Sequence, residues 1–486
     1  MTPIDAASDT TVDIAIVTAI DTPFDESILA ALADIVGPDR VLTDADSLLH
    51  YGRDWTRAYT PAAGAVVLPA SIDQVQEIVR LAARENLAIV PSGGRTGLSA
   101  GAVARNGELV LALDRLNLIA DFNPVDRTVR CGAGVVTAQL QQFAEEQGLF
   151  YPVDFASSGS SQIGGNISTN AGGIKVIRHG MTRDWVAGLK LVTGSGELLD
   201  LNRGLVKNNA GYDLRQLVIG AEGTLGVVVE ATMSLSRQPQ KLAVMVLGVP
   251  DMASIMAVLA AFQGSIELCA FEFFSELALC KVVEHQGLQR PFATTTEYYA
   301  LLEFEQPDEQ ATEQAMGLFE HCMEQGWVLD GVISQSVAQA ANLWRLREDI
   351  SETLSRWTPY KNDISTVVSR VPKFLAEVEA LVTASYPAFE VVWYGHIGDG
   401  NLHLNILKPD TMAIDEFQQR CGEVSTQVFE IVQRHGGSIS AEHGVGLLKK
   451  DYLHFSRSPL EIEIMRQIKR VFDPQGIMNP GKIFDV

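Results

Sequence analysis

The sequence predicts an α+β protein with more than one domain. Its 486 residues are too many for a single hydrophobic core. Strand-like and helix-like segments alternate over residues 61–110, whereas residues 240–430 combine strands with long amphipathic helices. A turn-forming run, Arg237-Gln238-Pro239, separates these two regions. We therefore expect four parts, which comprise residues 1–55, 56–238, 239–430 and 431–486.

Hydrophobic periodicity places the individual elements along the chain. A period of 3.6 residues predicts helices, and short runs of β-branched and aliphatic residues predict strands. The expected helices lie within residues 25–48, 71–85, 415–434 and 459–472. The expected strands cover residues 65–69, 87–91, 189–192, 218–219 and 227–235.

Composition limits the partners and the compartment. The formal net charge is −23, which disfavours nucleic acid and anionic membrane surfaces. The five cysteines are scattered and contain no CxxC motif, so they are expected to be free thiols in a reducing compartment. We see no basic leader and no apolar run long enough to span a bilayer. These features predict a soluble cytoplasmic protein.

The segment Trp393 to Asn405, WYGHIGDGNLHLN, indicates a metal-binding hairpin. Asp-Gly is a favoured pair for a two-residue type I′ turn. With that turn, His396 lies directly opposite His403, with Cβ atoms roughly 4.5–5.5 Å apart. Two imidazoles at that distance can share a divalent ion, and Asn405 projects from the same face. The alternative is an ordinary hairpin with two surface histidines.

The segment Ser440 to Gly446, SAEHGVG, offers a third ligand. Glu442 is an oxygen ligand and His443 a potential base. Adjacent residues in extended backbone point to opposite sides, so we expect only one of them to face a metal. Considered alone, the pair is as consistent with a loop cap as with a site. Together with the two histidines it indicates three ligands and an open position, as in catalytic metal sites.

Three glycine-rich segments with few charged residues indicate a cofactor site. Residues 91–97, PSGGRTG, follow a strand and could hold phosphate oxygens with backbone amides. The loop lacks the Walker and Rossmann patterns, and by itself a plain tight turn is equally plausible. Similar segments cover residues 152–173 and 220–227. Three such loops in one domain suit an extended cofactor with a pyrophosphate centre and planar ends.

Six motifs in order identify a resemblance that extends from about residue 40 to the C-terminus. They are PSGGRTGL, GSSQIGGNISTNAGG, VIGAEGTLGVV, GHIGDGNLH, SAEHGVG and FDPQGIMNPGK. Together they resemble the FAD-dependent 2-hydroxyacid dehydrogenases of the vanillyl-alcohol oxidase/p-cresol methylhydroxylase superfamily. The resemblance implies a two-subdomain, PCMH-type FAD-binding domain over residues 56–238. It also implies a substrate-binding cap domain over residues 239–430, and a small, mainly helical C-terminal region that completes the flavin and metal site.

The resemblance implies a set of residues for each ligand. FAD would be bound by the residues of the first loop, Pro91, Ser92, Gly93, Gly94, Arg95, Thr96 and Gly97. The rest of the flavin would be lined by Asp154, Ser161, Gly165, Asn166, Thr169, Glu222, Gly226, Val227 and Asn479. Arg95 stands near the place where some relatives carry a linking histidine, so non-covalent FAD is expected.

The substrate end follows from the same resemblance. His396, His403 and Glu442 match the family's metal triad, usually zinc, although these ligands also suit manganese or cobalt. His443 matches the catalytic base and Asn405 a substrate-contacting asparagine. Arg347, which we expect to open a helical run, Ser351 and Lys361 match a cluster that holds a distal carboxylate. Serine here replaces the expected threonine. From the sequence alone, Arg347 and Lys361 are more simply solvated charges.

The implied reaction is oxidation of a D-2-hydroxy acid to the 2-oxo acid, with hydride passing to flavin N5. A dicarboxylate is expected, D-2-hydroxyglutarate first and D-malate second. Electrons would leave to a carrier such as electron transfer flavoprotein or a quinone, and a homodimer is possible. Alternatives within the family are a D-lactate dehydrogenase or a glycolate oxidase flavin subunit. A non-catalytic flavin-binding or metal-storage protein is the alternative of a different class.

Overall fold

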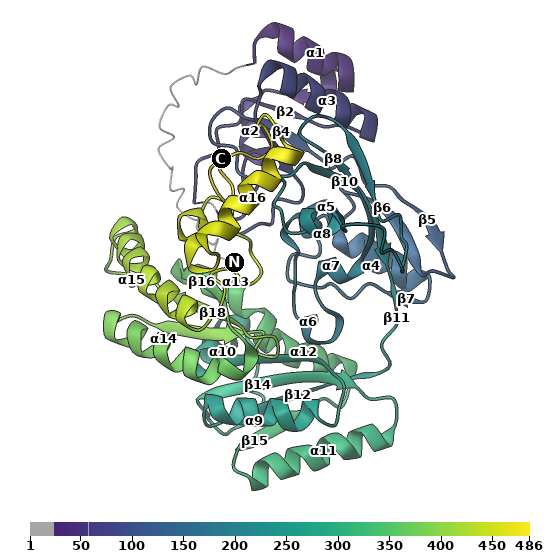
Figure 1. Cartoon of the computed structure of the whole chain (residues 1–486). Coiled ribbons are helices and arrows are strands. Elements are labelled where there is room, and N and C mark those ends of the chain that lie inside the picture. Colours follow the sequence, from purple (N-terminus) through teal and green to yellow (C-terminus); the bar gives the residue numbers. More distant parts are fainter. Residues whose placement is uncertain (1–23, 57) are drawn as a thin grey trace, which may run out of the picture.

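The computed structural model describes residues 24–56 and 58–486 as two halves that meet along a broad interface (Figure 1). Of the segment 1–55 predicted as a separate part, residues 1–23 lie outside the described residues. The N-terminal half contains a four-stranded, a five-stranded and a two-stranded sheet, and the C-terminal half is built on one large antiparallel sheet. The α+β class predicted from the sequence is confirmed.

The first sheet has the strand order β1-β2-β4-β3. Its strands are β1 (Val41–Leu42), β2 (Ala65–Val67), β4 (Leu109–Ala112) and β3 (Ile89–Ser92), and β2 and β3 run parallel to β4. Helices α1 (Glu26–Val36) and α3 (Ile72–Glu85) bury their apolar faces against it. The predicted helix over residues 25–48 is wrong in extent. Gly37, with φ of 91°, ends α1, and α2 (Ala45–Tyr51) begins only after β1.

The second sheet is antiparallel, in the order β5-β6-β10-β8-β9. It comprises β5 (Ile119–Asn123), β6 (Thr128–Gly132), β10 (Val227–Ser234), β8 (Val186–Val192) and β9 (Leu198–Leu201). Beside it lie α4 (Thr137–Glu146), α5 (Ile163–Thr169), α7 (Thr182–Trp185) and the small sheet β7 (Leu149–Phe150) with β11 (Ser236–Arg237), whereas α6 (Val176–His179) contacts β13 (Leu268–Ser275) of the C-terminal half.

The strand predicted at Val218-Ile219 is wrong, because Val218 ends the helical turn α8 (Arg215–Val218). Both side chains are buried in the core. Two adjacent apolar residues indicate that a segment is buried, but they cannot distinguish a strand from a helical turn.

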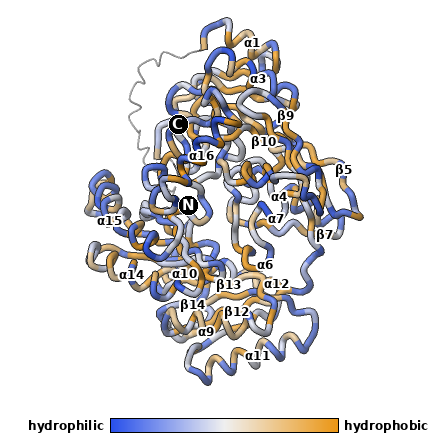
Figure 2. The backbone as a smooth tube through the Cα atoms, in the orientation of Figure 1, coloured by the Kyte–Doolittle hydropathy of each residue, from blue (hydrophilic) through white to orange (hydrophobic). Residues whose placement is uncertain are grey.

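The large sheet has seven antiparallel strands in the order β15-β12-β14-β13-β17-β18-β16. They are β15 (Asp330–Ile333), β12 (Leu242–Val249), β14 (Tyr298–Glu305), β13 (Leu268–Ser275), β17 (Val391–Gly395), β18 (Asn401–Ile406) and β16 (Tyr360–Ser365). One face packs on α9 (Met252–Gln263), α11 (Glu309–Glu324), α14 (Val371–Ser385) and α15 (Ile414–Arg434). The other face packs on α10 (Glu276–Gln286), α12 (Val337–Glu348) and α13 (Ile350–Leu354). Figure 2 shows the apolar strands β12, β13 and β14 inside this half, with polar and apolar residues alternating along α11.

The C-terminal segment returns to the N-terminal half. After α15, a loop leads to α16 (Pro459–Phe472), and Ile477 and Met478 pack into the core of the first sheet. The buried Lys469 of α16 donates hydrogen bonds to the carbonyl oxygens of Thr224 and Met478. The loop over residues 435–449 is therefore held between the two halves. Within the described residues, we find no helix of the length and apolarity needed to cross a membrane.

Candidate metal and flavin site

The connection between β17 and β18 differs from the predicted two-residue hairpin. His403 pairs with Tyr394, not with His396, and residues 396–400 form a longer loop. A type I′ turn needs φ > 0 at both central residues, but only Gly400 has it, at 86°. The amide of Gly398 instead donates to the carbonyl oxygen of Phe271 in the neighbouring strand β13. The predicted register is therefore wrong, because a third strand takes part in shaping the turn.

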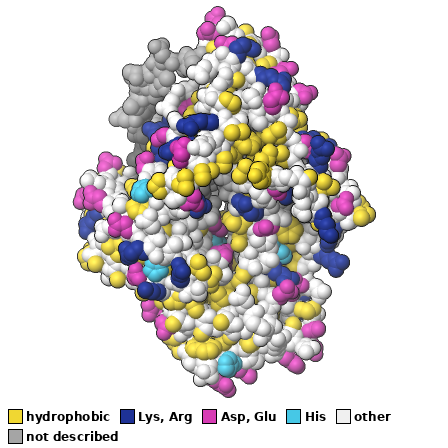
Figure 3. All heavy atoms as spheres, viewed as in Figure 1, with side chains coloured by type: hydrophobic (Ala, Val, Ile, Leu, Met, Phe, Trp, Pro, Cys, Tyr) yellow, Lys and Arg dark blue, Asp and Glu magenta, His cyan; other side chains and the backbone are white. Residues whose placement is uncertain are grey.

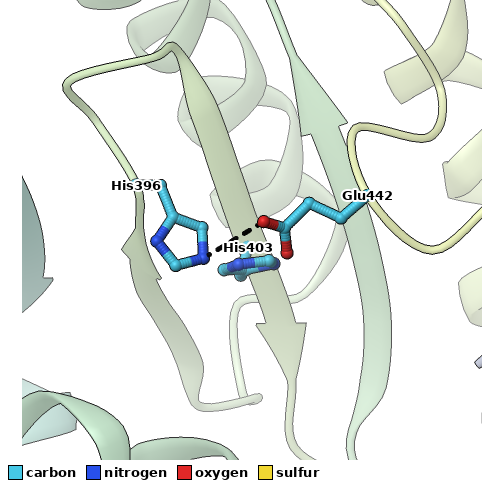
Figure 4. Close-up of side chains that lie close together, drawn as sticks. All are labelled: His396, His403 and Glu442. Carbon is cyan, nitrogen blue, oxygen red and sulfur yellow. Dashed lines mark ion pairs between the residues drawn. The ribbon is translucent and has the colours of Figure 1, made fainter. Parts of the chain in front are cut away.

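The two histidines nevertheless converge with Glu442, as predicted. Their ring centroids are 5.3 Å apart, and Nε2 of His396 lies 3.5 Å from Oε1 of Glu442. One potential ligand atom from each of the three residues lies within 4.8 Å of the others. Figure 4 shows the three side chains pointing toward one another, from the loop after β17, from β18 and from the segment after α15. Two nitrogens and a carboxylate oxygen at these distances form a donor set suited to a divalent ion.

A buried glutamate that sequence reasoning missed completes this cluster. Oε1 of Glu272, in β13, lies 2.8 Å from Nδ1 of His396. Burial would lower the pKa of His396, but the carboxylates of Glu272 and Glu442 outweigh it and raise that pKa well above its usual value. The site therefore favours a positive charge at its centre, which a metal ion would also supply. With Nδ1 facing Glu272, Nε2 is left to act as the ligand.

A second missed carboxylate, Asp363 in β16, lies beside the other histidines. Its Oδ1 is 3.7 Å from Nδ1 of His403, and its Oδ2 is 3.3 Å from Nδ1 of His443. Oδ2 also accepts hydrogen bonds from the backbone amides of Glu442 and His443. Burial would raise the pKa of Asp363, but His443, Lys449 and His403 hold it well below its usual range. Asp363 is thus an anion that orients two imidazoles.

His443 has the surroundings that a general base needs. Burial lowers its pKa despite the opposing effect of Asp363, so the neutral imidazole is the stable form at neutral pH. A contact between Nδ1 and Asp363 leaves Nε2 free to accept a proton. The His443 side chain is 24% exposed, whereas Asp363 is 2% exposed. The pair therefore presents one open, neutral base next to the three metal-ligand candidates.

The predicted distal-carboxylate residues also meet. Lys361 in β16 donates a 3.1 Å hydrogen bond to Oγ of Ser351 in α13. Arg347 stands 4.7 Å over the ring of Tyr394, another residue the sequence did not single out. Tyr394 is buried, and its hydroxyl interacts with both Ser351 and Asn405. The expectation that Arg347 opens a helix is wrong, because it lies in the last turn of α12, which begins at Val337.

Arg347 has hydrogen-bonding capacity to spare. It is 5% exposed, and Nη2 lies 2.8 Å from Oε2 of Glu272 without the alignment of a hydrogen bond. Among the described residues, neither Nε nor Nη2 of Arg347 has an acceptor. The buried Oδ1 of Asn405 likewise meets no donor in the part of the chain that the structure describes. Buried polar groups left unpaired by the protein are suited to pair with a ligand.

The site lies where the two halves meet. The amide of Gly173, just before α6 in the N-terminal half, donates a 3.0 Å hydrogen bond to Oε1 of Glu442. Glu222, also from that half, accepts hydrogen bonds from the amides of Val445 and Gly446. The loop that carries Glu442 and His443 is therefore fixed from both sides. Figure 3 shows this face of the molecule hollowed between the two halves, with charged and histidine side chains around the hollow.

The first glycine-rich loop is suited to bind a phosphate through its backbone. Within the described ranges, no backbone amide of residues 93–97 has a protein acceptor. A Cβ on Gly94 would come 2.2 Å from the carbonyl oxygen of Ser160, so this loop packs directly on the second one. A Cβ on Gly165, in the first turn of α5, would meet no protein atom within 4 Å. Free amides beside a glycine that faces open space fit the pyrophosphate of FAD.

Several residues predicted to line the flavin have protein partners instead of free side chains. Ser161 and Asn166 both hydrogen-bond to Oγ1 of Thr137, and Thr169 bonds to the carbonyl oxygen of Gly165. Nδ2 of Asn479 donates to the carbonyl oxygens of Gly101 and Glu222. Arg95 pairs with Asp114 and stacks on Tyr51. These residues shape the loops, and only backbone groups and a few free atoms, such as the buried Oδ1 of Asn479, remain to contact a cofactor.

Comparison with known proteins gives the family. Residues 238–483 match the family described as FAD linked oxidases, C-terminal domain, and residues 63–202 match the FAD binding domain. The chain belongs to the FAD-linked oxidase family. It is accordingly a flavin-dependent oxidoreductase, and the predictions of FAD and of an enzyme are confirmed. A metal, and the manner of FAD attachment, stay predictions.

Relatives match over nearly the whole chain. D-2-hydroxyglutarate dehydrogenase of Stutzerimonas stutzeri strain A1501 is 65% identical over 460 residues, which cover 95% of this chain and 99% of that protein. The mitochondrial D-2-hydroxyglutarate dehydrogenase of Bos taurus is 37% identical over 94% of this chain and 83% of its own length. A putative mitochondrial D-lactate dehydrogenase of Schizosaccharomyces pombe is 34% identical, over 94% of this chain and 90% of its own length.

Solved structures share the fold at low identity. P-cresol methylhydroxylase with substrate bound superposes with a TM-score of 0.74 at 16% identity, and covers 94% of this chain and 96% of its own. The 4-ethylphenol oxidase from Gulosibacter chungangensis gives a TM-score of 0.73 at 15% identity, and covers 94% of this chain and 97% of its own. The predicted PCMH-type architecture is thereby confirmed.

Proposed function

We propose that the chain oxidises a D-2-hydroxy acid with a second, distal carboxylate, D-2-hydroxyglutarate before D-malate, in an FAD- and metal-dependent reaction. The observation that carries the proposal is Arg347. It is a buried guanidinium whose Nε has no acceptor within the described residues, and Glu272 lies between it and His396 of the metal-ligand cluster. A chain of net charge −23 needs such a local cation to bind a dianion. The relatives' names support the same substrate.

Two bound groups would supply the chemistry that side chains lack. FAD would be held by the amides of residues 93–97 and would accept the hydride from C2. A divalent metal, with zinc as first choice, would be held by His396, His403 and Glu442 and would lower the pKa of the 2-hydroxyl group. The donor set is two imidazoles and one carboxylate, with no fourth ligand to this cluster among residues 24–56 and 58–486, which suits a catalytic site.

The chain's own residues would act on opposite ends of the substrate. His443, oriented by Asp363, would remove the proton of the 2-hydroxyl. Arg347, Ser351 and Lys361 would bind the distal carboxylate, with Tyr394 supporting the guanidinium. Asn405, whose Oδ1 is unpaired within the described chain, would contact the substrate. Transfer of electrons to electron transfer flavoprotein or a quinone, a cytoplasmic location and a homodimer belong to the same proposal.

A D-lactate dehydrogenase is the second candidate, because one relative carries that name. D-Lactate has no distal carboxylate, so it would leave Nε of Arg347 without an acceptor. A dicarboxylate can use this buried donor, which disfavours a monocarboxylate as the best substrate.

The deciding experiment is a substrate panel for the purified holoenzyme with an artificial electron acceptor. We expect kcat/KM to fall in the order D-2-hydroxyglutarate, D-malate, D-lactate. Arg347→Ala should lower kcat/KM for D-2-hydroxyglutarate by about 10–100-fold, since it removes a charge-assisted hydrogen bond, and should change D-lactate oxidation far less.

Arg345→Ala is the matched control for that variant. Arg345 lies in the same helix but pairs with Asp349 and is 44% exposed. It should leave the substrate order unchanged. A wild-type preference for D-lactate, or an equal loss on all substrates in Arg347→Ala, would replace the proposal with the monocarboxylate alternative.

A further inference from the structure

Glu272 is a single acidic residue within an otherwise apolar strand. Strand β13 reads LCAFEFFS, and Glu272 is 1% exposed at its centre. A buried carboxylate is stable only when charged or hydrogen-bonding partners compensate for its lost hydration. Its partners therefore indicate why this position carries a charge.

The two carboxylate oxygens of Glu272 face two residues with different tasks. Oε1 lies 2.8 Å from Nδ1 of His396, whose Nε2 points toward Glu442 at 3.5 Å. Oε2 lies 2.8 Å from Nη2 of Arg347. One side chain thus touches both a candidate metal ligand and the candidate anchor of the distal carboxylate.

Each contact has a defined physical effect. A carboxylate that accepts the Nδ1 proton of a histidine fixes the tautomer and ring orientation, and makes Nε2 a better ligand. A carboxylate beside a buried guanidinium balances its charge and restricts its position. Glu272 lies beside Nη2 of Arg347, and Nε of the same guanidinium has no acceptor among the described residues.

We propose that Glu272 is a positioning residue that sets His396 for the metal and Arg347 for the substrate, so that metal affinity and dicarboxylate selectivity depend on one carboxylate. This inference rests on the proposed function. It adds a link between the two ends of the substrate site, and it assigns Glu272 no contact with the substrate itself.

Glu303 provides a matched comparison in the adjacent strand β14. It is also buried, and it is ion-paired with Lys175 of the N-terminal half and accepts a 2.9 Å hydrogen bond from Nε1 of Trp344. These two partners differ from His396 and Arg347, the partners of Glu272. If Glu272 had only the structural role of a buried ion pair, replacing either glutamate would have similar consequences.

The test is Glu272→Gln beside Glu303→Gln, both as purified holoenzymes. Glutamine keeps the volume but removes the charge and one acceptor, so no orientation of the amide serves both partners. We expect Glu272→Gln to bind Zn²⁺ about 10–100-fold more weakly in competition with a chromophoric chelator. The ratio of kcat/KM for D-2-hydroxyglutarate over D-lactate should fall about tenfold or more, through KM for the dicarboxylate, because a displaced anchor weakens binding. Glu303→Gln should retain both properties.

Each outcome bears on the proposal. If Glu272→Gln keeps wild-type Zn²⁺ affinity, or loses it without a change in the substrate ratio, the link is overturned. The same holds if Glu303→Gln reproduces both effects. A wild-type enzyme without bound metal, or without dicarboxylate preference, would instead overturn the proposed function, which is measured first and separately.

A second pair of variants covers the case in which Glu272→Gln does not fold. These are Arg347→Gln and the double variant Glu272→Gln/Arg347→Gln. Both lack the guanidinium that Glu272→Gln alone would leave buried without a carboxylate partner. The proposal requires the double variant to bind Zn²⁺ more weakly than Arg347→Gln. Equal affinities would overturn it.

Discussion

The flavin loops and the metal pocket use opposite kinds of recognition. The loops at residues 91–97 and 159–166 offer backbone amides and glycines, and several of their side chains bond to other protein residues such as Thr137 and Asp114. The pocket between the halves gathers buried charged side chains: Arg347 and Glu272, Asp363 and the histidines. Backbone recognition depends on a contiguous stretch of chain, whereas side-chain recognition depends on residues brought together from several strands and loops. The two regions should therefore respond differently to substitution.

The largest difference is expected for His403→Ala. Loss of one of three ligands should abolish metal binding and lower turnover by orders of magnitude, whereas the flavin loops are untouched. Elemental analysis and the flavin absorbance of the same sample measure both properties. Full activity in a wild-type preparation free of metal would contradict this prediction, as would loss of FAD together with the metal.

The next effect concerns the base. His443→Asn should keep FAD and metal but lower kcat by about 10²–10⁴-fold, because proton removal from the 2-hydroxyl loses its acceptor. Steady-state kinetics with D-2-hydroxyglutarate, together with metal analysis, tests this expectation. A variant with unchanged kcat would assign proton removal to another group.

Gly165→Ala tests the backbone recognition that we expect of the flavin loops. Its Cβ would meet no protein atom within 4 Å, and alanine favours a helix over glycine by roughly 0.5–1 kcal/mol, so the fold should be retained. A methyl group against bound FAD should weaken FAD binding by about 10–100-fold, on the scale of overpacking costs of about 1–3 kcal/mol. Fluorescence titration of the apoprotein with FAD gives the affinity.

Gly317→Ala in α11 is the control for that substitution, since a Cβ there also meets no atom within 4 Å, far from the loops. It should bind FAD as the wild type does. Unchanged FAD affinity in Gly165→Ala would place the cofactor elsewhere.

The smallest effect is a pH dependence of stability at the contact between the regions. Burial raises the pKa of Glu222 from 4.5 to about 6, against the two hydrogen bonds it accepts. Between these pH values the unfolded chain has released the proton while the native state still holds it, so stability decreases as pH rises. The total is at most about 2 kcal/mol. Denaturant unfolding between pH 4.5 and 6 should show that the free energy of unfolding decreases more steeply with pH in the wild type than in Glu222→Gln. Parallel dependences on pH in the two proteins would contradict a raised pKa of Glu222.

Much of the fold and site follows from local sequence. Helices over residues 72–85, 414–434 and 459–472 lie where periodicity places them, because an amphipathic face repeats within the helix itself. The motifs that contain His396, His403 and Glu442 also predict that these residues form one cluster. Glu272 could have been found by a simple signal, a lone carboxylate in an apolar strand, because a buried charge needs a partner.

The sequence by itself determined the class of the fold, the positions of the glycine-rich loops, and which residue types form the candidate metal cluster. These properties are local, or are carried by side-chain chemistry that does not depend on register. Only the tertiary structure decided that His403 pairs with Tyr394, that Gly398 bonds to β13, and that Glu272 lies between His396 and Arg347. Each of these contacts joins different strands, loops or helices, and their meeting depends on how sheets and helices pack, a choice that no short stretch of sequence contains.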